Sequence, residues 1–151
     1  MIYNETIVIQ NNKAKRILEM CKKEGIELYD SINNKSRSIT GTSMKIFQKQ
    51  VENDAAMVSV WSEKTRDNIE ELFLTPRIVI EFNKKNKLED EFPTNPYGLQ
   101  AVVKKALLRQ IYFIEVIINE INEYKTTAKM ETNEVDVQTF GLTNNNANST
   151  E

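Results

Sequence analysis

The sequence predicts a mainly α-helical protein with a small β component, built from two long helices, one short helix, a small hairpin and extended terminal arms. Two long stretches in which apolar residues recur every three or four positions predict the long helices. Short stretches rich in β-branched residues indicate the β part. The chain has 151 residues, the size of one ordinary domain. We therefore expect a single helical domain over residues 1–128 and an extended polar arm over residues 129–151.

The N-terminal residues 2–9, IYNETIVI, are rich in β-branched and aromatic side chains and predict a short strand. Asn11 or Asn12 can cap the N-terminus of a short amphipathic helix, and Gly25 is expected to end this helix. The apolar face of this helix carries Ile17, Leu18 and Cys21. The next segment, IELYDSI at residues 26–32, fits either a strand or another helical turn.

A polar loop over residues 33–43 precedes the first long helix, with Thr42 or Ser43 as its N-cap. The helix is expected from about residue 43 to residue 74, roughly 48 Å at about 1.5 Å per residue, because Pro76 ends the pattern. Its apolar stripe consists of Phe47, Val51, Ala55, Val58, Trp61, Thr65, Ile69 and Leu72. We expect so long an element in so small a chain to need a neighbouring chain to bury this stripe.

Residues 77–82, RIVIEF, alternate charged and β-branched residues and predict a strand that pairs back in a hairpin near residues 77–92. A second long helix follows from about Tyr97 to Ala128, although its many β-branched residues leave a strand as the alternative. Its apolar face is broad, so we expect this helix to be central and contacted from several sides. The face includes Leu99, Val103, Ala106, Leu107, Ile111, Phe113, Ile114, Ile117, Ile118, Ile121 and Tyr124.

The composition excludes much chemistry. The chain has no His, so Ser/His/Asp and Cys/His nucleophilic machinery and His-based metal sites are excluded. One Cys allows neither an intramolecular disulfide nor a thiolate metal cluster, and Cys21 is expected to be a buried structural thiol. Four Gly lie too far apart for a phosphate-binding loop. We therefore expect no enzyme and no cofactor.

Carboxylates are the remaining candidates for metal binding. One set stands at helical spacing but has Lys64 and Arg66 interleaved, which indicates a solvated helix face. The other set lacks the spacing of a calcium loop, so we assign no metal. The two sets are Glu63, Asp67, Glu70 and Glu71, and Glu89, Asp90 and Glu91.

Basic residues crowd the N-terminal third, although the net charge is −2. Residues 1–50 carry nine Lys or Arg against five Asp or Glu. Phosphate contacts are therefore feasible, but no set of side chains is placed to read bases. The candidate phosphate contacts are Lys13, Lys15, Arg16, Lys22 and Lys23. A small intracellular nucleic-acid-binding regulator is one alternative function.

The tail also contains a candidate binding segment. Val135 and Val137 alternate with polar residues and precede Phe140 and Leu142, so residues 134–142 are expected to add as a strand to an exposed sheet edge of a neighbouring subunit. The chain shows no N-terminal signal peptide and no apolar stretch long enough for a membrane span. Its 17 Asn, 16 Ile and 15 Lys are typical of an AT-rich genome.

The leading hypothesis is a non-enzymatic structural subunit of a large assembly, most simply a tailed-bacteriophage virion protein such as a head–tail connector or neck-ring component. Its partners would be copies of itself and neighbouring structural proteins, in the virion or the host cytoplasm, without a membrane. An inhibitor or adaptor that binds another protein through the long helices is a further alternative. The expected interface residues are Val135, Val137, Phe140, Leu142, Trp61, Ile114 and Ile118.

Overall fold

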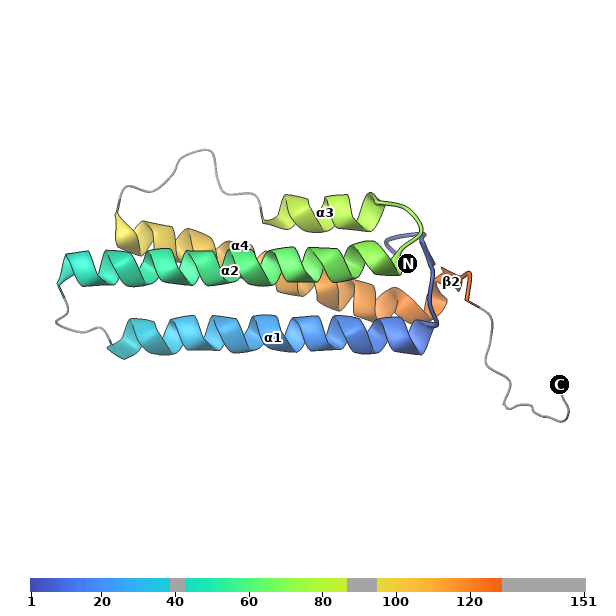
Figure 1. Cartoon of the computed structure of the whole chain (residues 1–151), viewed down its shortest axis with the longest axis horizontal. Coiled ribbons are helices and arrows are strands. Elements are labelled where there is room, and N and C mark those ends of the chain that lie inside the picture. Colours follow the sequence, from blue (N-terminus) through green and yellow to red (C-terminus); the bar gives the residue numbers. More distant parts are fainter. Residues whose placement is uncertain (39–42, 87–94, 129–151) are drawn as a thin grey trace, which may run out of the picture.

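The computed structural model describes residues 1–38, 43–86 and 95–128, and these residues form an antiparallel bundle (Figure 1). Each helix runs opposite to the one before it, and the third is much shorter than the others. The predicted fold class, mainly α with a small β component, is confirmed. The helices are α1 (Asn11–Ser38), α2 (Met44–Leu72), α3 (Arg77–Lys85) and α4 (Pro96–Glu120).

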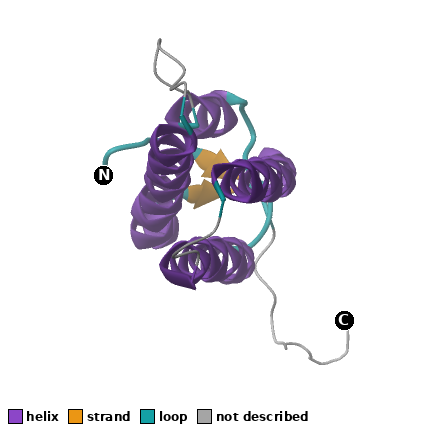
Figure 2. Cartoon of the chain, turned by 90° about the vertical axis from the view of Figure 1, so that its left-hand side faces the viewer, coloured by secondary structure: helices purple, strands orange, loops and turns teal. Residues whose placement is uncertain are grey.

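A small parallel sheet closes one end of the bundle, where it is seen between the helices in Figure 2. Strand β1 (Thr6–Ile7) pairs with β2 (Lys125–Thr126), with Ile7 opposite Thr126. On its other side, Ile7 forms an antiparallel bridge to Phe73. The segment after α2, the N-terminal strand and the C-terminal strand therefore meet at this end, with β1 in the middle. The N-terminal strand was expected, but β2 was not.

Helix α1 does not stop at Gly25, as the sequence had indicated, but runs for 28 residues to Ser38. Residues 26–32 are therefore helical. Gly25 is needed for another reason: a Cβ atom there would lie 2.6 Å from Trp61 Cζ2 and 3.0 Å from Ile111 Cγ1. The glycine thus lets the Trp61 ring of α2 pack directly on the backbone of α1.

Helix α2 agrees with its prediction. Ser43 caps it, since the Ser43 hydroxyl accepts a hydrogen bond from the Ile46 amide at 3.4 Å. The expectation that its stripe needs a neighbouring chain is wrong, because α1, α3 and α4 cover the stripe within one chain. The buried stripe consists of Phe47, Val51, Val58, Trp61, Thr65, Ile69 and Leu72.

The predicted hairpin near residues 77–92 is also wrong in its first half, because residues 77–85 form α3. Ile78, Val79 and Phe82 share the buried side of this helix, whereas Ile80 is exposed. Two α4 side chains meet carbonyls of the last turn of α3: Arg109 Nε donates to the Lys85 carbonyl at 3.0 Å and Gln110 Nε2 to the Phe82 carbonyl at 3.2 Å. These contacts supply donors that a helix C-terminus lacks and outweigh the β propensity of the segment.

Helix α4 is central, as expected, and packs against the other three helices. It ends at Glu120 rather than Ala128, and a 3₁₀ turn over Ile121–Glu123 leads into β2. The Asn11 side chain stabilises this earlier end, since its Nδ2 donates to the carbonyls of Ile121 at 2.6 Å and Tyr124 at 3.0 Å. Asn11, expected to cap its own helix, therefore caps the end of α4.

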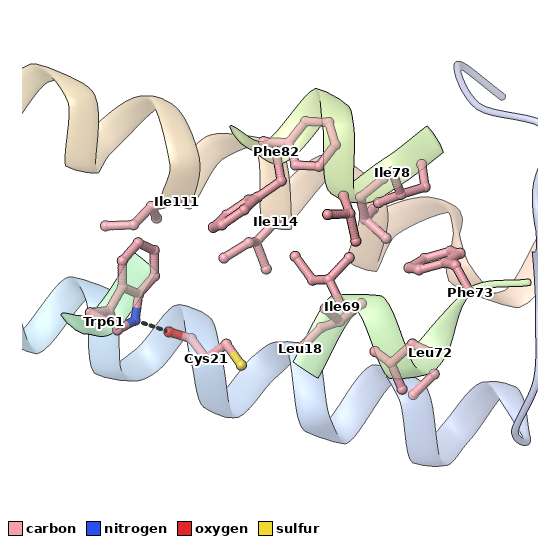
Figure 3. Close-up of a cluster of buried hydrophobic side chains, with 14 of the residues drawn as sticks. Leu18, Cys21, Trp61, Ile69, Leu72, Phe73, Ile78, Phe82, Ile111 and Ile114 are labelled. Atoms are coloured by element: carbon pink, nitrogen blue, oxygen red, sulfur yellow. Dashed lines mark hydrogen bonds between the residues drawn. The ribbon is translucent and has the colours of Figure 1, made fainter. Parts of the chain in front are cut away.

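The core is one continuous apolar cluster between the helices (Figure 3). Trp61 lies at the α1 side of this cluster, where its indole Nε1 donates to the Cys21 carbonyl at 3.0 Å. Farther along, Leu18, Ile69 and Ile114 pack between the helices. The second half of the predicted hairpin and the polar arm at residues 129–151 lie outside the described residues.

The substitution Gly25→Ala tests the close approach at Trp61. We expect a net loss of about 1 kcal/mol in the free energy of unfolding, because overpacking costs about 1–3 kcal/mol and replacing a helical glycine returns up to about 1 kcal/mol. Urea unfolding measures it. In Trp61→Leu, the same Gly25→Ala change should cost less or stabilise the chain. A Gly25→Ala variant more stable than the parent would contradict the contact.

Candidate functional site

A pocket that combines apolar walls with positive charge lies beside α4 and has a volume of about 280 Å³. Four α4 residues at helical spacing line one side of it: Arg109, Tyr112, Phe113 and Val116. The N-terminal arm, the residues 1–5 before β1, provides one wall. The last residue of α3 provides another. These wall residues are Ile2, Tyr3 and Lys85.

A buried carboxylate from α4 holds the arm in place. Glu120, only 8% exposed, accepts hydrogen bonds from the backbone amides of Ile2 and Tyr3 and from the Tyr124 hydroxyl, the last at 2.8 Å. The Tyr3 ring then packs edge-on against Phe113, with ring centroids 5.5 Å apart. The pocket wall therefore depends on Glu120.

A second buried carboxylate fixes the arm further along. Glu5, 7% exposed, accepts a hydrogen bond from the Thr75 hydroxyl at 2.8 Å and pairs with Arg77 at 3.5 Å. The Arg77 guanidinium also lies over the Tyr3 ring, 5.9 Å from its centroid. Contacts from both α3 and α4 thus keep the arm against the bundle.

The Glu120 carboxylate is held in its charged form. Burial opposes ionisation, but hydrogen bonds from Ile2, Tyr124 and Tyr3 outweigh it and lower the pKa of Glu120 below its ordinary value. Burial raises the pKa of Tyr124, and the adjacent Glu120 carboxylate raises it further. Tyr124 therefore stays a neutral donor and Glu120 a charged acceptor at neutral pH.

The rim of the pocket is basic. The Lys85 ammonium lies over the Phe113 ring, 5.9 Å from its centroid, and Arg109 is positioned by its bond to the Lys85 carbonyl. Tyr112 and Ile2 are 64% and 69% exposed and border the opening. An apolar floor with cations at the rim suits a large apolar or aromatic side chain that has acidic groups nearby.

A second hollow, of about 170 Å³, lies between α2 and α3 and is polar. It is lined by Ser59, Ser62, Glu63, Arg66, Asn83 and Asn86. Such a mixed set of donors and acceptors lacks an apolar floor on which a partner side chain would bury surface. The pocket beside α4 is therefore the stronger candidate.

Two of the three helical residues expected at a subunit interface, Trp61 and Ile114, lie in the core instead. Trp61 is 6% exposed and Ile114 is 0% exposed, both inside the core of the chain itself. Neither side chain presents surface to a neighbour, and both stabilise the fold instead. Ile118 is half-buried against the same core. The other expected interface residues, Val135, Val137, Phe140 and Leu142, lie outside the described residues.

The five candidate phosphate contacts do not form one patch. At about 100° per residue, Arg16 and Lys23 face away from the core, while Lys15 and Lys22 lie on one flank of α1 and Lys13 lies on the other. Lys22 pairs with Glu115 at 2.7 Å. The outward face also carries Glu19, Glu27 and Asp30, so it has mixed charge.

The α2 carboxylates and Cys21 agree with their predictions. Glu63, Asp67, Glu70 and Glu71 are exposed. In the described part of the chain, no three His, Cys, Asp or Glu side chains gather as they would around a metal ion. Cys21 is buried, and burial raises the pKa of its thiol. No helix within residues 1–38, 43–86 and 95–128 has the length and apolarity to cross a membrane.

The pocket residues were not predicted from the sequence. Arg109 had not been singled out, and Phe113 had been assigned to the broad apolar face of its helix. The available signal was the spacing of Arg109, Tyr112, Phe113 and Val116, which places a cation and two aromatic rings on one side of a helix. Nothing in the sequence indicated that Tyr3 would lie against them.

Comparison with protein-family models, curated proteins and solved structures gave no match.

Replacing Glu120 by Gln tests the anchor of the arm. We expect a loss of about 1–2 kcal/mol at pH 7, because hydrogen bonds to a charged group contribute about 1.5–3 kcal/mol and an amide keeps part of them. The lowered pKa means that the contribution of Glu120 is fully present above its unfolded value of about 4.3 and is lost as the pH falls through the folded-state pKa.

Urea unfolding between about pH 7 and about pH 3 measures both effects. Glu120→Gln should therefore lose less stability on acidification than the parent chain. Glu123→Gln, which changes an exposed carboxylate three residues away, is the matched control and should behave like the parent. Equal acid sensitivity in the parent and in Glu120→Gln would show that the arm is not anchored by this charge.

Proposed function

We propose that this chain is a non-enzymatic structural subunit that assembles with copies of itself. The observation that carries the proposal is the pocket beside α4, which brings exposed Tyr112 and Ile2 together with Arg109 and Lys85. Tyr and Arg are among the residues most enriched at the energetic centres of protein–protein interfaces. A protein side chain is therefore the occupant whose chemistry fits best.

The burial of the core within a single chain supports this proposal. The long helices bury their stripes within one chain, so the fold does not need Tyr112 and Ile2 to be covered. Single exposed apolar residues are ordinary on protein surfaces. These two differ because they border a preformed pocket with aromatic walls, where an added side chain would bury apolar area without rearranging the bundle.

The placement of basic residues favours assembly over nucleic-acid binding. Cations at the pocket rim surround an apolar floor, whereas those of α1 lie on three sides of the helix and alternate with carboxylates. Phosphate binding needs clustered positive charge along one surface. The inhibitor or adaptor alternative would use the same pocket with a different protein, and the oligomeric state of the purified chain separates it from self-assembly.

The finer proposal is a component of a tailed-bacteriophage virion, such as a head–tail connector or neck-ring protein, located in the virion or the host cytoplasm. Its support is the abundance of Asn, Ile and Lys, typical of AT-rich genomes, together with a polar tail suited to contact with neighbours. In a heterologous contact, one surface of each copy meets a different surface of the next copy. Such contacts generate rings when the rotation between neighbouring copies closes.

Light scattering of the full chain across a concentration range tests self-assembly. We expect a discrete oligomer, which Tyr112→Ala dissociates because it removes an exposed pocket side chain without touching the core. Tyr97→Ala is the matched control, since Tyr97 is 63% exposed on the same helix but away from the pocket. A chain that stays monomeric at every concentration would overturn self-assembly and favour the adaptor function.

A further inference from the structure

We infer that the pocket beside α4 holds residues 134–142 of a second copy of this chain, with the Phe140 ring on its apolar floor. This inference rests on the proposed function and names the segment that makes the contact. Residues 134–142 lie outside the described residues, and their sequence matches the geometry and charge of the pocket.

The segment has the two properties that the pocket selects. Phe140 is the only aromatic residue after Ala128, and Glu134 and Asp136 precede it. In an extended chain, alternate residues point to the same side, so Glu134, Asp136 and Phe140 share one face while Val135 and Val137 occupy the other. The segment therefore presents one aromatic ring and two carboxylates together.

The pocket is complementary in size and charge. Its volume of about 280 Å³ lies just below the roughly 300–1,000 Å³ of pockets for drug-sized ligands, so it suits a single large side chain. Phe113 and Val116 supply an apolar floor, and Lys85 and Arg109 supply positive charge at its border. Acidic residues before Phe140 would meet these cations while the ring contacts Phe113, whose own edge-on partner is Tyr3.

The position of the N-terminal arm favours a second copy, rather than the same chain, as the source of this segment. Beyond β2, the chain leaves the fold beside Ile7, whose carbonyl accepts the Thr127 amide at 2.9 Å. The N-terminal arm, residues 1–5, joins β1 to the pocket wall and is held against α4, since Ile2 and Tyr3 contact Glu120 and Tyr3 packs on Phe113. A tail from the same chain would have to run around the arm, whereas a tail from a neighbour enters from solvent.

The length of the tail allows the contact. Six steps from Ala128 to Glu134 reach up to about 20 Å when extended, enough to pass from one molecule to its neighbour. Each copy would give its tail to one neighbour and receive a tail from another. This heterologous arrangement is the one that builds closed rings.

Peptide binding is the first test. A fluorescent peptide of residues 131–143, ETNEVDVQTFGLT, is titrated with the chain ending at Ala128, which keeps every described helix and strand. We expect saturable binding that weakens at least tenfold with Phe140→Ala in the peptide or Tyr112→Ala in the protein. Binding should also weaken as NaCl rises from about 50 mM to about 500 mM, because exposed ion pairs are screened.

Two controls make this test specific. Val137→Ala in the peptide changes the opposite face of the extended segment and should leave binding within about twofold, as should Tyr97→Ala in the protein. If Val137→Ala weakened binding more than Phe140→Ala, and Tyr112→Ala had no effect, the segment would bind by strand addition elsewhere. That result would overturn the inference.

Complementation tests whether the tail acts between molecules. A full-length Tyr112→Ala chain has an intact tail but a damaged pocket, and the wild-type chain ending at Ala128 has an intact pocket but no tail. We expect each to be monomeric alone and the mixture to form a one-to-one complex by sedimentation velocity. The same mixture with Phe140→Ala added to the full-length chain should remain monomeric.

The possible results separate this inference from the proposed function. A full-length oligomer that Tyr112→Ala dissociates, together with no peptide binding, would overturn the tail as occupant and leave self-assembly standing. A monomeric full-length chain whose truncated form still binds the peptide would mean that the tail fills its own pocket. That result would overturn both.

Discussion

The packing of Trp61 directly on the backbone of α1 is the constraint on which the rest of the bundle depends. Its ring lies 2.6 Å from where a Cβ at Gly25 would be, Ile111 of α4 lies 3.0 Å from the same point, and the ring centroid of Phe82 in α3 is 6.3 Å from that of Trp61. Because the indole also donates to the Cys21 carbonyl, its orientation is fixed as well as its depth. One side chain therefore sets the spacing of the three long helices and gives the short helix α3 a surface on which to pack.

Buried carboxylates, together with apolar packing, secure the end of the bundle opposite to the α1–α2 connection. A buried carboxylate is costly unless hydrogen bonds satisfy it. Glu5 and Glu120 meet this condition by binding the Thr75 hydroxyl and the arm amides, respectively. The arm is thereby tied to α3 and α4 at once, and Tyr3 becomes both a cover for Phe113 and a wall of the pocket.

Periodicity in the sequence was sufficient for α2 and for the central place of α4, because one broad apolar face must be covered from several sides. Sequence patterns gave a wrong prediction where the same residues are compatible with two different local structures. Gly25 resembles a helix stop, and only its contact with Trp61 reveals close packing. Residues 77–82 have strand propensity, but donors from α4 stabilise them as a helix. The pocket could not be predicted, because its walls come from the arm, α3 and α4, and the arm reaches α4 across 118 positions in sequence.

The early end of α3 links this architecture to the proposed binding function. A helix that stops beside a longer neighbour leaves carbonyls that need donors. Arg109 and Gln110 of α4 provide them, so the Arg109 side chain is drawn to the end of α3 and lies beside Lys85. The positive rim of the pocket is therefore a consequence of how the fold completes a short helix. A partner that supplies carboxylates at this position would use charge that the fold has already ordered, so less conformational entropy is lost on binding than with mobile surface lysines.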